Sequence, residues 1–394
     1  MVSERTQPVE DRHRVAGWVR GTIDEADELR LRSADRQTGD DVEYPGISEM
    51  LRDFRDPSLL HEYSHPTCRK IERVESSMWT ERPWLHELLV CPNHERGLTA
   101  DNDVLQCDLG DSFPIVGGIP RFTPASSYAD NFGFEWTRFP RLQLDDETST
   151  ESSDSFRRRT GFAPEDLQGK RILDGGCGMG RFADIAARWG GHVVGVDISA
   201  AVDAAAGNLE GFANAALVQA DLRRLPFAHG TFDIVFSLGV LHHTPNTFQS
   251  MSRLAALVKP GGMLAVWVYS SRLRWTLAGG ELLRQLTRRM EPETLLRTVN
   301  AVAPRAHALK QRAPRFARYV DLVVPTSNHP NPDWRVLDTF DWYSPRYQWK
   351  HTYAEVEGWF HRLGFEEVDR QDFPVSVRGR RPLGPSRQDA AGSA

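Results

Sequence analysis

The run LDGGCGMGRF at residues 173–182 constrains the fold of this chain more than any other feature of its sequence. A short apolar stretch, RILD, comes before it, and glycines then stand at every second position, at 176, 178 and 180. From about Arg181 the apolar residues follow a helical period. A strand, a glycine loop and a helix in this order predict the start of a βαβ unit, whose ligands bind beyond the carboxyl end of the strand.

The residues after this loop continue the alternation of strands and helices. HVVGVD, ALVQAD, FDIVFSLG and MLAVWVY predict four further buried strands, with helical patterns between them. Residues 271–350 interrupt the alternation with amphipathic helices, which we expect to form a cap. A capping box at Thr352 and Glu355 then starts a last helix, and FEEVDRQ and FPVSV predict a final hairpin. The predicted fold is therefore α/β, with a mostly parallel sheet whose last strand is antiparallel.

The spacing of the glycines decides which ligand the loop suits. A dinucleotide fingerprint, G-x-G-x-x-G, would need a third glycine at position 181 or 183, where Arg181 and Ala183 stand. The chain also contains no GxxxxGK[ST] run, so a P-loop is excluded.

The acid-x-G-x-G-x-G pattern resembles the first motif of the class I S-adenosylmethionine (SAM)-dependent methyltransferases. The resemblance spans about residues 165–270 and returns at 350–377. It implies a Rossmann-like sheet with SAM as cofactor. It also implies that Asp174 lies near the methionine part, that Asp197 accepts hydrogen bonds from the ribose hydroxyls, and that Asp221 contacts the adenine amino group. The remaining SAM contacts implied are two apolar residues around the adenine, Ile198 and Leu222, the loop glycines Gly175, Gly176, Gly178 and Gly180, and the end of the fourth strand, Ser237 and Leu238.

Methyl transfer needs an aligned acceptor, exclusion of water and, for some acceptors, a base. His242 and His243 follow the fourth strand, where a histidine can act as a base near neutral pH. The segment WYSPRYQWKHT at 342–352 is dense in aromatic and hydrogen-bonding side chains and predicts a wall of the substrate pocket. We expect catalytic roles for His242, His243, Tyr347 and His351, and substrate contacts from Trp136, Tyr269, Tyr343 and Arg346.

The residues before the predicted SAM domain divide into three parts. We expect residues 1–84 to be helical and partly disordered, 85–124 to form a small β unit, and 125–169 to be a linker or lid. CPNH and CDLG in the second part resemble a Trm112-like zinc ribbon, but its four ligand positions hold Cys91, His94, Cys107 and Gly110. Glycine offers no ligand, and Asp108 or Asp111 could complete the set only with a changed spacing, so we expect a degenerate ribbon and no metal. Residues 170–377 are the expected methyltransferase domain with its cap at 271–350, and 378–394 a disordered tail.

Charge and hydropathy limit the partners. The net charge is −6 with a pI of about 6.1, which disfavours nucleic acid, and the apolar runs are too short to span a membrane. Four cysteines are too few for a disulfide scaffold, and the first residues do not resemble a signal peptide, so we expect a cytoplasmic protein. Its oligomeric state stays open.

The leading hypothesis for function is methyl transfer to a small molecule, such as a specialised metabolite or an intermediate derived from a sugar or amino acid. A second hypothesis keeps SAM but uses or cyclises its aminocarboxypropyl group, which releases methylthioadenosine. A third is a protein that binds SAM without catalysis.

Overall fold

A computed structural model describes residues 78–124, 127–271 and 278–384. The expectations for most of residues 1–84 and for 385–394 therefore lie outside the described residues. Among the described residues, no helix combines the length and the apolar character that crossing a membrane requires.

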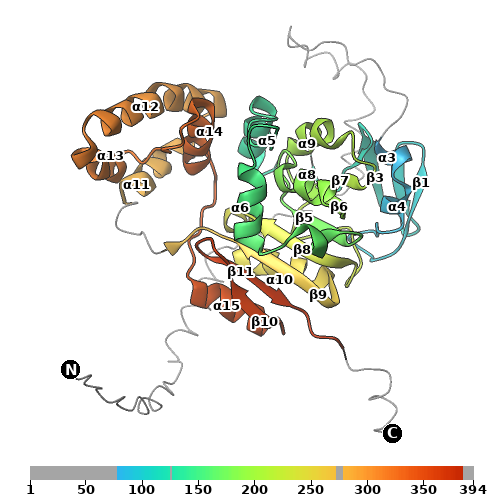
Figure 1. Cartoon of the computed structure of the whole chain (residues 1–394). Helices are drawn as coiled ribbons and strands as arrows, with labels where there is room; N and C mark the ends of the chain where they lie inside the picture. The colour runs from blue at the N-terminus through green and yellow to red at the C-terminus, as the bar shows by residue number, and fades with distance from the viewer. Residues whose placement is uncertain (1–77, 125–126, 272–277, 385–394) are drawn as a thin grey trace, which may run out of the picture. The chain divides into compact units, whose positions relative to one another are not determined.

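The central element is a seven-stranded sheet with the order β10-β11-β9-β8-β5-β6-β7 (Figure 1). Its neighbours from β9 to β7 pair in parallel, whereas β11 runs antiparallel to both β9 and β10. This confirms the predicted mostly parallel sheet with one antiparallel strand near its end. The strands are β5 (Arg171–Gly175), β6 (His192–Asp197), β7 (Ala215–Gln219), β8 (Phe232–Leu238), β9 (Val258–Trp267), β10 (Glu366–Arg370) and β11 (Ser376–Arg380).

The strand order reverses between β5 and β8, because the chain adds β6 and β7 on one side of β5 and then β8 and β9 on the other. At such a switch point the loops leaving the two strands diverge and open a crevice at their carboxyl ends. The glycine loop leaves β5 at this point, which places it at the mouth of the crevice.

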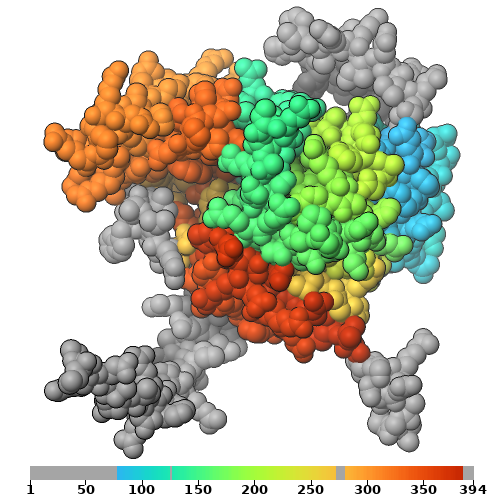
Figure 2. All heavy atoms as spheres, viewed as in Figure 1, coloured from blue at the N-terminus to red at the C-terminus, as the bar shows by residue number. Residues whose placement is uncertain are grey.

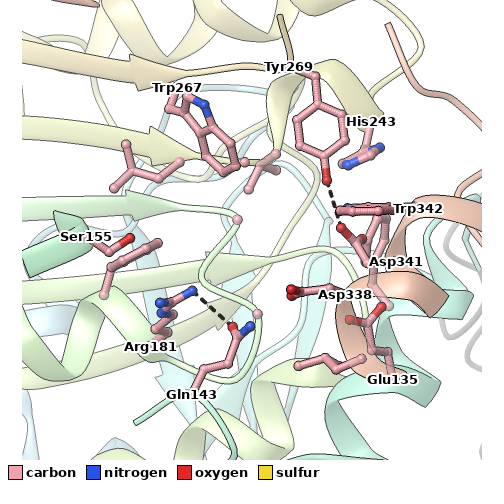
Figure 3. A pocket seen from close by; sticks show the side chains of 18 of the residues that line it. Glu135, Gln143, Ser155, Arg181, His243, Trp267, Tyr269, Asp338, Asp341 and Trp342 are labelled. Carbon is pink, nitrogen blue, oxygen red and sulfur yellow. Dashed lines mark hydrogen bonds between the residues drawn. The ribbon is translucent and has the colours of Figure 1, made fainter. Parts of the chain in front are cut away.

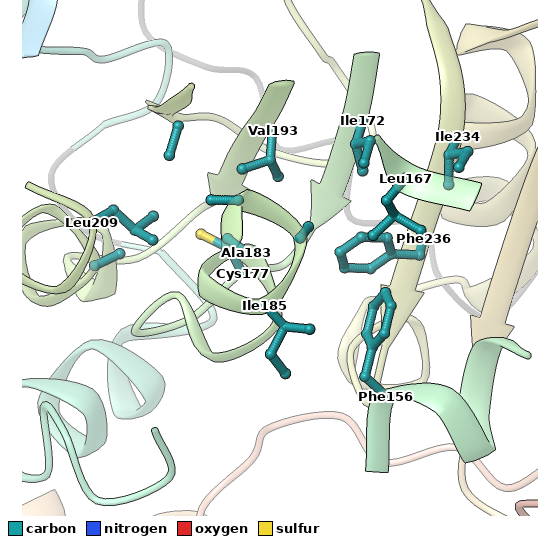
Figure 4. Packing of buried hydrophobic residues seen from close by; sticks show 14 of the residues in the cluster. Phe156, Leu167, Ile172, Cys177, Ala183, Ile185, Val193, Leu209, Ile234 and Phe236 are labelled. Carbon is teal, nitrogen blue, oxygen red and sulfur yellow. The ribbon is translucent and has the colours of Figure 1, made fainter. Parts of the chain in front are cut away.

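The hydrophobic core lies between the sheet and its flanking helices (Figure 4). Ile172, Val193 and Leu217 are fully buried on neighbouring strands, and Phe156 packs edge-on against Phe236 with ring centroids 5.1 Å apart. Burying a large apolar side chain contributes about 1.5–3 kcal/mol. The flanking helices are α6 (Glu151–Thr160), α7 (Pro164–Leu167), α8 (Arg181–Arg188), α9 (Ala201–Leu209), α10 (Thr247–Leu257) and α15 (Tyr353–Arg362), with a 3₁₀ turn η2 (Leu241–His243).

A small N-terminal unit covers the β7 edge of the sheet. It comprises α3 (Met78–Glu81), α4 (Pro83–His86) and a four-stranded antiparallel sheet of β1 (Leu98–Asp101), β2 (Val104–Cys107), β3 (Ser112–Val116) and β4 (Ile119–Pro120). Arg82 is buried and donates hydrogen bonds to the carbonyls of Ala215 and Phe212. The Phe122 amide donates to the Gln219 carbonyl at 2.7 Å. These bonds satisfy groups that an open sheet edge would leave unpaired.

The segment expected to be a linker or lid holds α5 (Asp130–Arg138), α6 and α7. The cap comprises α11 (Ala278–Thr287), α12 (Pro292–Arg312), a 3₁₀ turn η4 (Pro314–Phe316), α13 (Ala317–Val323) and α14 (Pro332–Tyr343) (Figure 2). It has its own core, in which Leu295 and Val299 of α12 meet Phe340 of α14, and Phe134 of α5 packs against the same cluster. The helix α5 therefore joins the cap to the sheet.

Candidate active site

A cavity of about 1050 Å³ opens beyond the carboxyl ends of the central strands. The glycine loop, Asp197 and the Leu238–Val240 segment line one part of it, and α5, α6 and the cap helices line the rest (Figure 3). Pockets for single drug-sized ligands hold about 300–1,000 Å³. This volume gives room for a cofactor and a second molecule together.

The glycine loop takes a conformation that only glycine adopts without strain. Gly176, Gly178 and Gly180 have φ angles of +88°, +53° and +88°. A Cβ on Gly176 would lie 2.3 Å from a methyl group of Val240, and a Cβ on Gly178 would lie 3.0 Å from the Trp136 indole nitrogen. The predicted substrate contact Trp136 therefore lies directly against the loop.

Asp197 ties this loop to the end of β6. Its Oδ2 accepts a hydrogen bond from the Gly178 amide at 3.0 Å, and its Oδ1 accepts from the amide and hydroxyl of Ser199 at 2.9 and 2.8 Å. Desolvation raises the pKa of Asp197, and these hydrogen bonds oppose the rise. Asp197 lines the cavity together with Ile198 and Leu222, the residues predicted to contact the ribose and the adenine.

Other predicted cofactor residues support the site from behind its surface. Asp174 is buried, and desolvation followed by the charge of Asp197 raises its pKa well above the ordinary value. The Ser237 hydroxyl donates to the Gly175 carbonyl at 2.6 Å. Asp221 forms an ion pair with Arg223, with 2.7 Å between Oδ2 and Nη2. Among the predicted cofactor residues, Gly176, Gly178, Asp197, Ile198, Leu222 and Leu238 line the cavity, whereas Asp174, Gly175, Gly180, Asp221 and Ser237 do not.

His243 is the predicted catalytic residue that lines the cavity. Its Nδ1 lies 2.9 Å from the backbone carbonyl of Tyr347. A carbonyl only accepts hydrogen bonds, so Nδ1 carries the proton and Nε2 keeps its lone pair. Nε2 is buried and has no hydrogen-bond partner among the described residues. Burial lowers the pKa of His243 to about 4, so the imidazole is neutral at pH 7.

The other three predicted catalytic side chains do not line the cavity. His242 is fully buried behind it, with its ring centroid 4.1 Å from that of His243 and 3.9 Å from that of Tyr269. His351 Nε2 lies 3.0 Å from the Thr247 hydroxyl. Tyr347 contributes its carbonyl to His243, while its ring packs against Tyr128. The pocket-wall segment thus positions His243 through its backbone.

Of the predicted substrate contacts, Tyr269 and Tyr343 line the cavity with Trp136, whereas Arg346 is exposed outside the lining. The Tyr269 hydroxyl donates to Asp341 Oδ2 at 2.8 Å. Sequence reasoning missed Asp338 and Asp341, which line the same wall from α14. Their spacing of three residues puts both carboxylates on one helical face, a signal that was present in the sequence.

Glu135 and a set of arginines were also missed. The Arg159 guanidinium contacts the rings of both Trp267 and Phe373, with its carbon 4.2 and 3.8 Å from their centroids, and burial lowers its pKa to about 9. Arg181 donates to the Ser152 hydroxyl and to Gln143 Oε1. Figure 3 shows Arg181 on the opposite side of the cavity from Glu135 and Asp338. The cavity therefore has a basic side and an acidic side.

The acidic side predicts how stability depends on pH. Burial raises the pKa of Asp338 and of Asp341 to about 6, so the folded chain binds more protons than the unfolded chain between about pH 4 and 6. The free energy of unfolding of the ligand-free protein should therefore fall as pH rises through this window. We expect Asp338→Asn to be more stable than the parent at pH 7.5, by up to about 3 kcal/mol for a shift of about two pKa units. Thermal unfolding at pH 4.5 and 7.5 checks this, and a stability gain at pH 4.5 as large as at pH 7.5 would contradict it.

Away from this cavity, the N-terminal unit brings three potential metal ligands together. The ligand atoms of Cys91, His94 and Cys107 all lie within 4.8 Å of one another.

Comparison with known proteins agrees with this geometry. Residues 173–266 match the family model described as a methyltransferase domain. The ubiquinone biosynthesis O-methyltransferase of Rhizobium etli is 33% identical over 150 residues, which cover 33% of this chain and 59% of that protein. The protein of the same name from Bordetella avium is 35% identical over 113 residues, covering 27% of this chain and 44% of that protein. The chain thus spans about half the length of these curated relatives.

Among solved structures, the SAH-bound magnesium protoporphyrin IX methyltransferase of Synechocystis PCC 6803 aligns over 64% of this chain and 96% of its own. The TM-score is 0.37 and the identity 19%. The family match and the sheet topology together define a class I SAM-dependent methyltransferase domain. SAM is the cofactor of this domain.

Proposed function

We propose that the whole chain is an enzyme that transfers the methyl group of SAM to a small-molecule acceptor. The observation that carries this proposal is a neutral histidine, His243, which lines a cavity large enough for a cofactor and an acceptor and whose Nε2 has no hydrogen-bond partner among the described residues. SAM supplies an electrophilic methyl group on a sulfonium, so the protein's task is to align the acceptor, exclude water and accept a proton.

Each part of that task has candidate residues. Asp197 and the glycine loop hold the nucleoside end of the cofactor. His243 Nε2 accepts the proton that the acceptor loses, and the Tyr347 carbonyl keeps the imidazole in the required tautomer. The cap and α5 line the side of the cavity where the acceptor binds and reduce its contact with bulk water.

The acceptor is proposed to be a polar small molecule, such as a specialised metabolite or a sugar- or amino-acid-derived intermediate. Support comes from the volume of the cavity, about 1050 Å³, and from the cap helices that contribute residues to its lining. Its wall holds Tyr269, Asp338 and Asp341, which suit hydroxyl and amino groups better than hydrocarbon.

Calorimetric titration of the purified full chain with SAM, followed by mass analysis of SAM after incubation alone, tests this function. Micromolar binding with intact SAM is expected. Release of methylthioadenosine would redirect the assignment to aminocarboxypropyl transfer or cyclisation. If protein that circular dichroism shows to be folded does not bind SAM, the proposed function is overturned. Gly176→Val should remove binding, because its side chain would collide with Val240.

A further inference from the structure

Three carboxylates meet on the acidic side of the cavity. Glu135 comes from α5, and Asp338 and Asp341 come from α14 (Figure 3). Asp341 accepts the Tyr269 hydroxyl, and Asp338 accepts the Ser327 hydroxyl at 2.9 Å. Glu135 is only 1% exposed, and its Oε2 has no hydrogen-bond partner in the described part of the chain.

The protein does not pair these acids with a cation. Within residues 78–124, 127–271 and 278–384, no lysine, arginine or histidine forms an ion pair with Glu135, Asp338 or Asp341. His329 and Arg181 lower the pKa of Asp338, and Arg284 lowers that of Asp341, only at longer range, although all three line the same cavity. A buried carboxylate without a partner is costly, and either a proton or a bound cation relieves that cost. Glu135, Asp338 and Asp341 form one wall of the cavity, which we call the acidic wall. A ligand bound in the cavity can therefore supply the cation.

We infer that the acceptor carries an amino group, which is protonated when it binds against Glu135, Asp338 and Asp341. This inference rests on the proposed function and names its substrate class. His243 Nε2 takes one proton from the ammonium and frees the nitrogen lone pair. The nitrogen then forms a bond to the methyl carbon as the carbon–sulfur bond breaks, and that electron pair stays on sulfur. The methylated product is again a cation, which the same wall neutralises.

The test compares acceptors that differ only in the attacking group. Glucosamine with glucose, and tyramine with tyrosol, are incubated with the full chain and SAM at pH 8, and S-adenosylhomocysteine release is measured. Binding of the same four probes to the protein saturated with S-adenosylhomocysteine is measured by calorimetry. At least one amine should bind, and be methylated, at least about tenfold better than its alcohol. Equal or better use of the alcohol, or no binding of either amine, would overturn the inference.

Variants of these acids distinguish an effect on acceptor binding from an effect on SAM binding. Glu135→Gln and Asp338→Asn should weaken amine binding at least about tenfold and leave the SAM dissociation constant unchanged. Asp154→Asn is the matched control, because Asp154 also lines the cavity but is exposed and paired with Arg157. An equal loss of SAM affinity in Glu135→Gln would show that the wall holds the cofactor's own cation. Equal or better methylation of the alcohols would overturn this inference alone, whereas absence of SAM binding would overturn the proposed function.

A second site is carried by a different observation, in the N-terminal unit. Cys91 and Cys107 are buried, and each Sγ lies 3.5 Å from His94 Nδ1. Asp111 Oδ2 lies 3.1 Å from Cys91 Sγ and 3.3 Å from His94 Nδ1. The fold thus adds a carboxylate oxygen to the two sulfurs and one nitrogen.

The turn between β2 and β3 explains how Asp111 reaches this place. Gly110 has a φ of +101°, its amide donates to the Cys107 carbonyl, and the Cys107 amide donates to the Asp111 carbonyl at 2.8 Å. The chain reverses there and returns Asp111 beside Cys107. Sequence spacing alone had placed Gly110 at the fourth ligand position, which left only three ligands.

We propose that Cys91, His94, Cys107 and Asp111 bind one Zn²⁺ as a structural site. Two thiolates, an imidazole and a carboxylate are ligands that tetrahedral zinc accepts. The metal would join the segment after α4 to the β2–β3 turn, in the unit that covers the β7 edge.

Metal analysis of the full chain, purified after zinc supplementation, tests the site. We expect about one zinc per chain, almost complete loss in Cys107→Ser, and at least tenfold weaker zinc affinity in Asp111→Asn. Asp101→Asn is the control, since Asp101 is exposed at the end of β1, and this variant should keep its zinc. Asp108 does not serve as a control, because its Oδ1 lies 3.5 Å from Cys107 Sγ. Metal-free protein, or zinc retained by Cys107→Ser, would overturn the site. Full affinity in Asp111→Asn would remove Asp111 from it.

Discussion

Asp197→Ala is expected to weaken SAM binding by at least about 100-fold. The substitution removes the proposed acceptor for the ribose hydroxyls, and it also removes the bond from the Gly178 amide that ties the glycine loop to β6. A hydrogen bond to a charged group contributes about 1.5–3 kcal/mol, and the variant loses more than one such bond. Calorimetric titration with SAM measures the effect directly.

Two further variants serve as comparisons for Asp197→Ala. Asp197→Asn keeps a carbonyl oxygen for one acceptor role and should lie between the parent and the alanine variant. Asp221→Ala should cost less than Asp197→Ala, because the Asp221 carboxylate is already engaged by Arg223 and does not line the cavity. If Asp221→Ala proved the more damaging, the adenine contact would outweigh the ribose contact. An unchanged dissociation constant in Asp197→Ala would remove that residue from the cofactor site.

The parts of the fold that follow from local periodicity could be predicted from the sequence. The strands from RILD to MLAVWVY are short apolar runs, and burial on both faces of a parallel sheet requires that composition. The glycine loop could be predicted for a similar reason, since the positive φ angles of Gly176 and Gly178 exclude other residues. These features depend on residues that are close together in the chain.

The acceptor side depends on contacts between distant segments, which local patterns do not encode. Glu135 and Asp341 are more than 200 positions apart, and only the packing of α14 on α5 brings their carboxylates to one wall. The polar run TSTESSDS predicted a linker, but Ser152 and Phe156 are buried where α6 packs on α8. Tertiary burial overrides weak helix propensity there. Asp111 reaches the cysteine cluster because the chain turns at Gly110. The spacing of ligands along the sequence does not reveal the geometry of that turn.

The chemical step gives the second large effect. His243→Ala is expected to lower kcat by about 100- to 1,000-fold while the SAM dissociation constant stays within about twofold, in line with the loss of a general base. The acceptor for this measurement is the best amine from the probe comparison, followed by S-adenosylhomocysteine release. His243→Gln should be equally slow, because an amide fills the space but accepts no proton. A rate close to that of the parent would dismiss His243 as the base.

Tyr347→Phe is the matched control for this prediction, because Tyr347 orients His243 through its backbone carbonyl, which the substitution keeps. Its kcat should equal that of the parent.

The pH profile adds an independent check. Because burial lowers the pKa of His243 to about 4, protonation of this imidazole does not limit kcat/KM between pH 6 and 8. A fall in kcat/KM on the acid side near pH 6 belongs instead to Asp338 and Asp341, whose pKa values burial raises to about 6. That fall should therefore persist in Tyr347→Phe and change in Asp341→Asn, and an unchanged profile in Asp341→Asn would assign it to another group.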